Sequence, residues 1–155
     1  MKLAEALIER ATIQTRMAEL KQRMGNYARV QEGDRPAEEP AVLLAEYNRL
    51  AERLLHLIQR INATNVATPL DASDPGGMQI AEAIAVRDVL RMRFGTLQNT
   101  VNATFNQRFG RNEIRYESTI DVPAWRAAAD ELAREQRELD TKIQGRNWTV
   151  DLIEE

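Results

Sequence analysis

Apolar residues return along four long stretches of the chain in steps that alternate between three and four residues. The first stretch has the seam residues Leu3, Ala6, Arg10, Ile13, Met17, Leu20 and Met24. This spacing puts one apolar face along a helix, and Arg10 is its polar exception. Together the four stretches predict helices over about residues 2–24, 41–66, 78–106 and 122–144.

The second stretch carries two neighbouring seams. The first seam consists of Leu43, Tyr47, Leu50, Leu54, Leu57, Ile61 and Thr64. The second seam consists of Leu44, Asn48, Ala51, Leu55, Ile58, Asn62 and Asn65. Both together are too wide for one partner helix, so we expect at least two neighbours. A bundle of one chain could supply both, but we expect a homo-oligomer.

The last two helical stretches show the same spacing with more interruptions. The third has the apolar stripe Ile80, Ile84, Val86, Leu90, Phe94, Leu97, Val101 and Phe105, with Arg87 and Arg91 within or beside it. The fourth has the seam Val122, Trp125, Ala129, Leu132, Gln136, Leu139 and Ile143. Asp121 is expected as its N-cap and Gly145 as its end, while Gly25 is expected to end the first helix.

Two shorter segments predict strands. Residues 113–121 alternate between apolar and polar side chains, which is typical of a half-buried strand. An isolated strand leaves its backbone groups unpaired, so residues 27–33 are its expected partner. The predicted fold is mainly α: one domain over residues 1–155, built as a bundle of long antiparallel coiled-coil-like helices with a small two-stranded β element at one end.

Composition and charge exclude several classes of site and partner but do not identify a function. The formal net charge of −3 makes nucleic acid an unexpected partner. Cysteine is absent, which excludes disulfides, thiolate metal sites and cysteine nucleophiles. Glu5 and Glu9 interrupt the first apolar stretch, and no window approaches the ~18 apolar residues of a membrane span. We therefore expect a cytoplasmic protein that does not engage a membrane.

Six segments carry a resemblance to a known family. They are MKLAEAL (1–7), ARVQEG (28–33), RINATN (60–65), RDVLR (87–91), STIDV (118–122) and LDTKIQ (139–144) with the following NW (147–148). Over nearly its whole length the chain resembles a family of small uncharacterised bacterial proteins, some of them labelled septicolysin. The resemblance implies no established activity and carries over no catalytic residue.

Several residues could in principle carry chemistry. His56, the single histidine, lies between the seams and is better read as a surface residue. Glu131, Glu135 and Glu138 share a helix face but alternate with arginines, as a solvated face does. The loop at Asp74 to Gly77 lacks the Gly-Lys-Ser/Thr of a phosphate-binding loop. We therefore expect no catalytic residue, no metal site and no cofactor.

Arginines offer the remaining candidate sites. Arg108, Arg111 and Arg115 cluster near Phe109 and Tyr116, where they could bind an anion or pair with nearby glutamates. A second set lies on the apolar seams, where a charge is costly unless it is paired. Its candidate ligand-binding members, here called the polar belt, are Arg10, Asn62, Asn65, Arg87 and Arg91. These residues either fix helix register or line a pocket for a small anion.

Three functions remain open from the sequence. A self-associating, non-enzymatic scaffold or interaction protein is the preferred interpretation, because the heptads are continuous and no catalytic constellation is present. The alternative is a protein that binds, or acts on, a small anionic ligand through the polar belt. A remote alternative is a membrane-active toxin, which the septicolysin label suggests.

Overall fold

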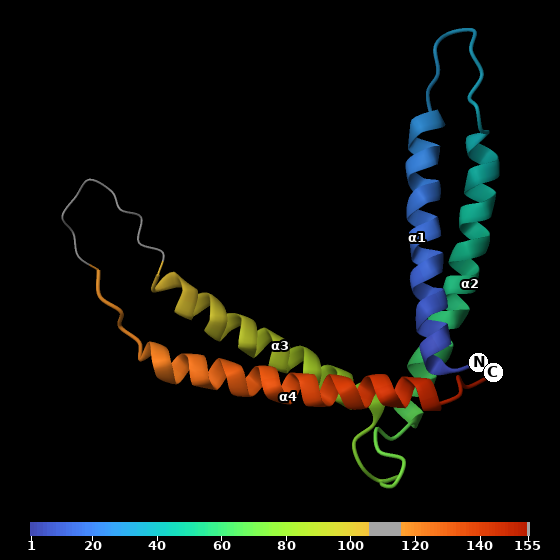
Figure 1. The fold of residues 1–155 in the computed structure, drawn as a ribbon. Helices are drawn as coiled ribbons and strands as arrows, with labels where there is room; N and C mark the ends of the chain where they lie inside the picture. Colours follow the sequence, from blue (N-terminus) through green and yellow to red (C-terminus); the bar gives the residue numbers. More distant parts are fainter. Residues whose placement is uncertain (106–115, 155) are drawn as a thin grey trace. The chain divides into compact units, whose positions relative to one another are not determined.

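The computed structural model describes residues 1–105 and 116–154. Its helices are α1 (Leu3–Tyr27), α2 (Pro40–Ala67), α3 (Ile80–Ala103) and α4 (Val122–Thr149). Figure 1 shows α1 beside α2 and α3 beside α4. The fold is therefore mainly α with four helices, as predicted. Within the described ranges, none of these helices combines the length and hydropathy that a membrane crossing requires.

Two compact units divide the chain. The first comprises Met1–Thr68 with Arg146–Glu155, and the second comprises Pro69–Gly145. α4 thus belongs to the second unit as far as Gly145 and to the first unit through its last turn. Each unit is built on one antiparallel helical hairpin. The single domain expected over residues 1–155 stays a prediction.

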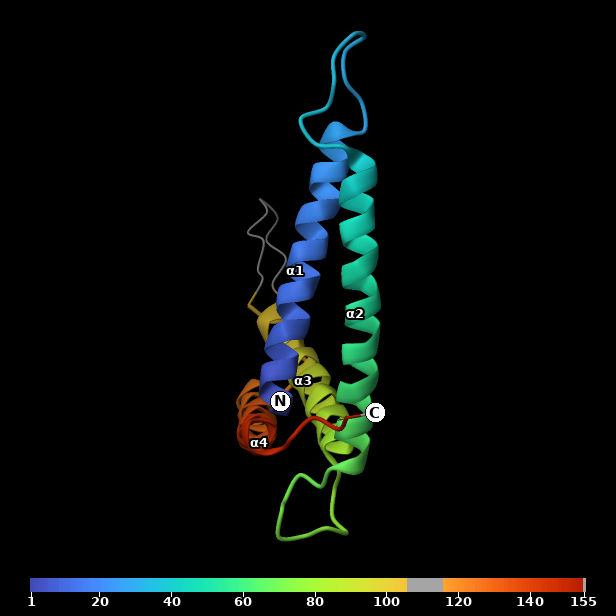
Figure 2. The same ribbon diagram turned by 90° about the vertical axis from the view of Figure 1, so that its right-hand side faces the viewer.

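The α1–α2 hairpin is held by one apolar seam from each helix. The two helices run side by side in both views of the ribbon (Figures 1 and 2). The buried members of the predicted seams are Leu3, Ala6, Ile13 and Leu20 in α1 and Leu43, Leu57, Ile61 and Thr64 in α2. All of them belong to the alternating three-four spacing, so the heptad pattern correctly identified the hydrophobic interface of this unit.

Ion pairs follow one edge of the same hairpin at intervals of seven residues along α1. Nε of Arg53 donates to Glu9 at 2.7 Å. Next, Arg16 donates to Glu46 at 3.0 Å, and then Arg23 pairs with Glu38. These hydrogen bonds raise the pKa of Arg16 and Arg23 and lower that of Glu38. Opposite charges at flanking heptad positions fix the direction and register of the two helices.

The two ends of the chain meet on this hairpin. The Leu3 N–H donates to the carbonyl of Val150 at 2.9 Å, and the Leu152 N–H donates to the carbonyl of Met1 at 2.8 Å. The buried hydroxyl of Thr64 accepts from the N–H of Ile153 at 3.0 Å. Val150 and Leu152 are buried, so the tail adds apolar cover as well as backbone pairing. We call residues 1–3 with 150–153 the terminal clasp.

The buried residues of α3 follow heptad spacing more strictly than the apolar stripe predicted for this helix. In α3 the buried residues are Ile80, Ala83, Leu90 and Val101, whereas Val86 is exposed. The seam therefore steps through Ala83 and Arg87 rather than through Ile84 and Val86. In α4 the predicted seam is correct, since Ala129, Leu132 and Ile143 are all buried.

The predicted two-stranded β element is wrong. Tyr27 ends α1, and residues 28–33 form bends and a turn in which the Asp34 N–H donates to the carbonyl of Gln31 and Gly33 has a φ of 91°. Residues 116–121 are irregular, while 113–115 lie outside the described residues. Alternation gives a strand only where a second extended segment supplies hydrogen bonds, and residues 27–33 form no strand. Extended pairing in the described ranges is limited to the isolated bridges Lys2–Asp151 and Pro69–Gln79.

Two helices extend beyond the glycines that were predicted to end them. α1 continues past Gly25 to Tyr27, and α4 continues past Gly145 to Thr149. A glycine inside a helix costs about 1 kcal/mol relative to alanine. The N-cap of α4 is as predicted, because Asp121 accepts from the N–H of Ala124 at 3.1 Å.

Two isoleucines of α1 offer a matched test of the seam. Ile13 is 5% exposed and Ile8 is 57% exposed. We expect Ile13→Ala to lower the free energy of unfolding by about 2–4 kcal/mol, because it leaves a cavity between α1 and α2. Ile8→Ala should cost less than about 1 kcal/mol. Urea denaturation followed by circular dichroism measures both, and equal losses would show that the seam is misplaced.

The terminal clasp should weaken in acid. Lys2 lies 2.9 Å from Asp151, and its hydrogen bond lowers the pKa of that carboxyl. A lowered pKa adds stability above the ordinary pKa of aspartate, and this stability is lost as pH falls through the lowered value. We expect Asp151→Asn to speed amide exchange at Leu3 and Leu152 at neutral pH. Near pH 2, by rough estimate, variant and parent should exchange alike.

Glu154→Gln is the control for this comparison. Glu154 is exposed and forms no ion pair in the described part of the chain. Its exchange rates at Leu3 and Leu152 should therefore match those of the parent at both pH values. If the Asp151→Asn difference persisted unchanged in acid, the ion pair would not be its cause.

Candidate functional site

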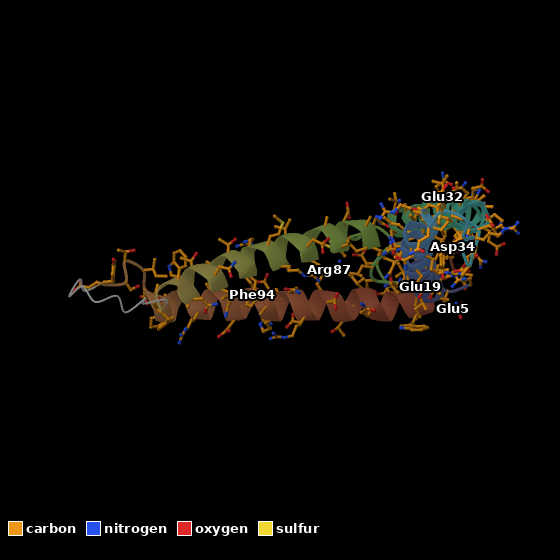
Figure 3. All side chains as sticks on the ribbon, turned by 90° about the horizontal axis from the view of Figure 1, so that it is seen from above. Glu5, Glu19, Glu32, Asp34, Arg87 and Phe94 are labelled. Atoms are coloured by element: carbon orange, nitrogen blue, oxygen red, sulfur yellow. The ribbon has the colours of Figure 1, made fainter. Side chains whose placement is uncertain are left out.

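Arg87 is the member of the polar belt with the best-defined surroundings. It occupies a seam position of α3, between the buried residues Ala83 and Leu90. Figure 3 labels Arg87 and Phe94 along the side of α3 that faces α4. The side chain of Arg87 is only 19% exposed. A seam between two helices would normally bury an aliphatic residue at this place.

Two carboxylates balance the charge of Arg87. Its NH2 donates to Oδ1 of Asp88 at 2.9 Å, and its NH1 donates to Oδ1 of Asp140 in α4 at 3.3 Å. Partial burial opposes the charged guanidinium, but the hydrogen bonds and attraction of both aspartates outweigh it and raise the pKa of Arg87. The acidic residues Glu5 and Glu9 of α1 have other partners: Glu5 accepts from the N–H of Lys2, and Glu9 pairs with Arg53.

Arg91 lies one turn further along α3 and is exposed. Residues four apart on a helix are offset by about 40°, because one turn takes 3.6 residues. A hairpin seam is narrow, so this offset carries Arg91 away from α4. Of these two arginines, Arg87 thus lies on the seam and Arg91 lies beside it.

The other three belt residues belong to the first unit and do not converge. Arg10 is half-buried at a seam position of α1, and its Nε is buried without a hydrogen-bond partner. Asn62 is exposed, whereas Asn65 is half-buried with an unpartnered Oδ1. Because Glu9 pairs with Arg53, the neighbouring Arg10 lies opposite the part of α2 around Arg53. Asn62 lies nine residues beyond Arg53, which is about 13 Å at 1.5 Å per residue.

A hollow of about 570 Å³ lies at the tip of the first hairpin, in the loop between α1 and α2. Arg29 and Arg35 line it together with Val30, Gln31 and Asp34. This pair of arginines was not among the residues predicted from the sequence. Their placement on either side of Gly33, a residue type that favours chain reversals, is the sequence signal that could have found the hollow. The carboxylate of Asp34 offsets part of their charge, so the hollow does not favour an anion strongly.

The remaining candidates are satisfied by their neighbours. Arg134 binds both Glu131 and Glu138, which lowers the pKa of Glu131, and the three form a solvated helix face. In the loop at residues 71–77, the N–H and hydroxyl of Ser73 both donate to Asp71. Within residues 1–105 and 116–154, no group of three or more acidic or histidine side chains could hold a metal ion. The cluster Arg108, Arg111 and Arg115 lies outside the described residues.

Comparisons with known proteins find a family and a similar solved structure. A family model described as a family of unknown function (DUF6847) matches residues 10–152. A functionally unknown conserved protein from Corynebacterium diphtheriae, solved by crystallography, is 39% identical with a TM-score of 0.90, and the match covers 99% of both chains. No curated protein matches the chain. The bacterial, uncharacterised family expected from the resemblance is thus found, whereas the septicolysin label has no support.

Arg87 and Arg91 form a matched pair for testing the polar belt. We expect Arg87→Ala to lower the free energy of unfolding by about 1–2 kcal/mol, because it removes two charged hydrogen bonds while the aspartates stay partly hydrated. Arg91→Ala should change it by less than about 0.5 kcal/mol. Chemical denaturation measures both values. A gain in stability for Arg87→Ala would indicate a strained cationic pocket rather than a structural ion pair.

Proposed function

The chain therefore belongs to this family of unknown function, and we propose that it is a non-enzymatic scaffold or interaction protein that associates with itself through coiled-coil-like helices. The observation that carries this proposal is the second seam of α2. Leu44 is 49% exposed and Leu55 is 55% exposed, although both lie on a regular heptad pattern. Apolar side chains left in water at heptad spacing favour association.

Geometry around the candidate residues supports a structural interpretation. Arg87 is neutralised by two aspartates within its own unit. Glu9, Arg16 and Arg23 are paired across the first hairpin. These groups set the direction and register of helices, and a protein that holds partners apart or together needs such fixed helices. We also propose that this role is performed in the cytoplasm, on the sequence grounds given above.

A second candidate is a binder of a small anion. The buried Nε of Arg10 and the buried Oδ1 of Asn65 lack hydrogen-bond partners, and buried polar atoms in that state call for an explanation. Under this alternative, Arg10, Asn62, Asn65, Arg87 and Arg91 would supply the contacts. The separation of Asn62 from Arg10 along the first hairpin argues for the scaffold instead.

Light scattering coupled to size-exclusion chromatography tests the proposal. We expect a particle of about twice the 17.7 kDa of one chain at micromolar concentration. A mass of one chain across the accessible concentrations would contradict self-association. A thermal-shift series with phosphate, sulfate and nucleoside phosphates tests the alternative, since a ligand at 100 times its Kd would stabilise the fold by about 2.7 kcal/mol.

A further inference from the structure

The second seam of α2 has its own side of the helix. Leu43 of the first seam and Leu44 of the second are successive residues, so the two seams lie about 100° apart around α2. The first seam is covered by α1, and Leu57 on it is buried. Asn48, Leu55 and Asn62 on the second seam are all exposed. A further helix could therefore contact this seam without displacing α1.

The residue types on the second seam repeat in register. Asn48, Leu55 and Asn62 are seven residues apart and share one heptad position. Leu44, Ala51, Ile58 and Asn65 are also seven apart and share the other. In a parallel pair of helices each heptad position faces its own counterpart. A parallel pair of second seams would thus place leucine against leucine and asparagine against asparagine.

We infer that two copies of this chain associate through α2, with their second seams parallel and in register. This inference rests on the proposed function and adds to it the surface and the orientation. Each asparagine carries both a donor and an acceptor, so Asn48 and Asn62 can each hydrogen-bond the same residue of the other copy. Asparagine at a single repeated seam position is a known determinant of register and of the number of helices.

Antiparallel pairing fits this seam less well. It sets one heptad position against the other, and full overlap of Leu44 to Asn62 would then put Asn48 against Ile58 and Asn62 against Leu44. Each amide would be buried beside an aliphatic side chain, which is costly. Moving the copies one heptad apart sets Asn62 against Ala51 in one direction and carries it beyond the start of α2 in the other.

Charge at the edge of the seam points the same way. Glu52 follows Ala51 and is exposed, with no ion pair in the described residues. In the fully overlapping antiparallel pair, the two copies of Glu52 would lie within about one turn of each other and repel. In the parallel pair, Glu52 lies beside Leu54 or Tyr47 of the other copy, so no like charges meet.

Single cysteines test the orientation directly, because the chain has none of its own. We expect Ala51→Cys and Leu44→Cys each to form a disulfide-linked dimer under mild oxidation. Two residues two turns apart can both face their own counterparts only when the helices are parallel. Ala11→Cys tests another surface, since Ala11 lines a hollow of about 480 Å³ with Ile8 and Thr15 on α1. Cross-linking through Ala11 alone would overturn the inference.

Glutamate substitutions give a second measurement that does not depend on oxidation. Leu55→Glu should raise the dimer dissociation constant by about 100-fold, because it puts two like charges into one seam layer. Val42→Glu is the matched control, since Val42 is equally apolar, is 64% exposed and lies on the far side of α2 from the second seam. Its dissociation constant should stay within about threefold of the parent.

These results separate the inference from the proposal on which it rests. A dimer that is equally sensitive at Val42 and Leu55 keeps the scaffold and overturns this surface. A dimer that Leu55→Glu weakens but that cross-links at neither Leu44 nor Ala51 is not parallel and in register, and it overturns the orientation. A chain that is monomeric in light scattering overturns both.

Discussion

The first unit depends on one contact, the packing of a single seam of α1 against a single seam of α2. A pair of helices has no enclosed interior, so each helix keeps most of its circumference in water. Most of the residues that become buried in the two helices therefore recur at every third or fourth position. Everything else in the unit either aligns this contact or extends it.

Alignment comes from charge. The pairs Glu9–Arg53, Arg16–Glu46 and Arg23–Glu38 lie along one edge of the contact. Ion pairs this exposed contribute little stability each. A shift by one heptad would set Arg16 against Arg53 in one direction and Glu46 against Glu9 in the other. Either shift therefore brings two like charges together. They act mainly on which register is adopted, and the apolar seam supplies the free energy.

Sequence periodicity predicted the helices and most of the buried residues because a seam is a local property of one helix. It was less reliable where a small or charged residue stood on the seam. Ala83 and Arg87 looked less like core than Ile84 and Val86, so the predicted stripe ran through the wrong pair, although strict heptad spacing would have selected Ala83 and Arg87. The β element failed because pairing depends on where a distant segment lies. The separation of the belt residues along α2 could not be predicted, since it follows from the register of the hairpin rather than from any one stretch.

The terminal clasp holds the two ends of the chain together at one end of the first hairpin. Main-chain hydrogen bonds join Met1 and Leu3 to Leu152 and Val150, so the backbone nearly returns to its starting point. Any polypeptide attached ahead of Met1 and any attached beyond the tail would emerge from one spot. The loop between α1 and α2 lies at the opposite end of the hairpin (Figure 2). A circular permutant with joined ends and a new break at that loop would keep both seams of α2 unbroken.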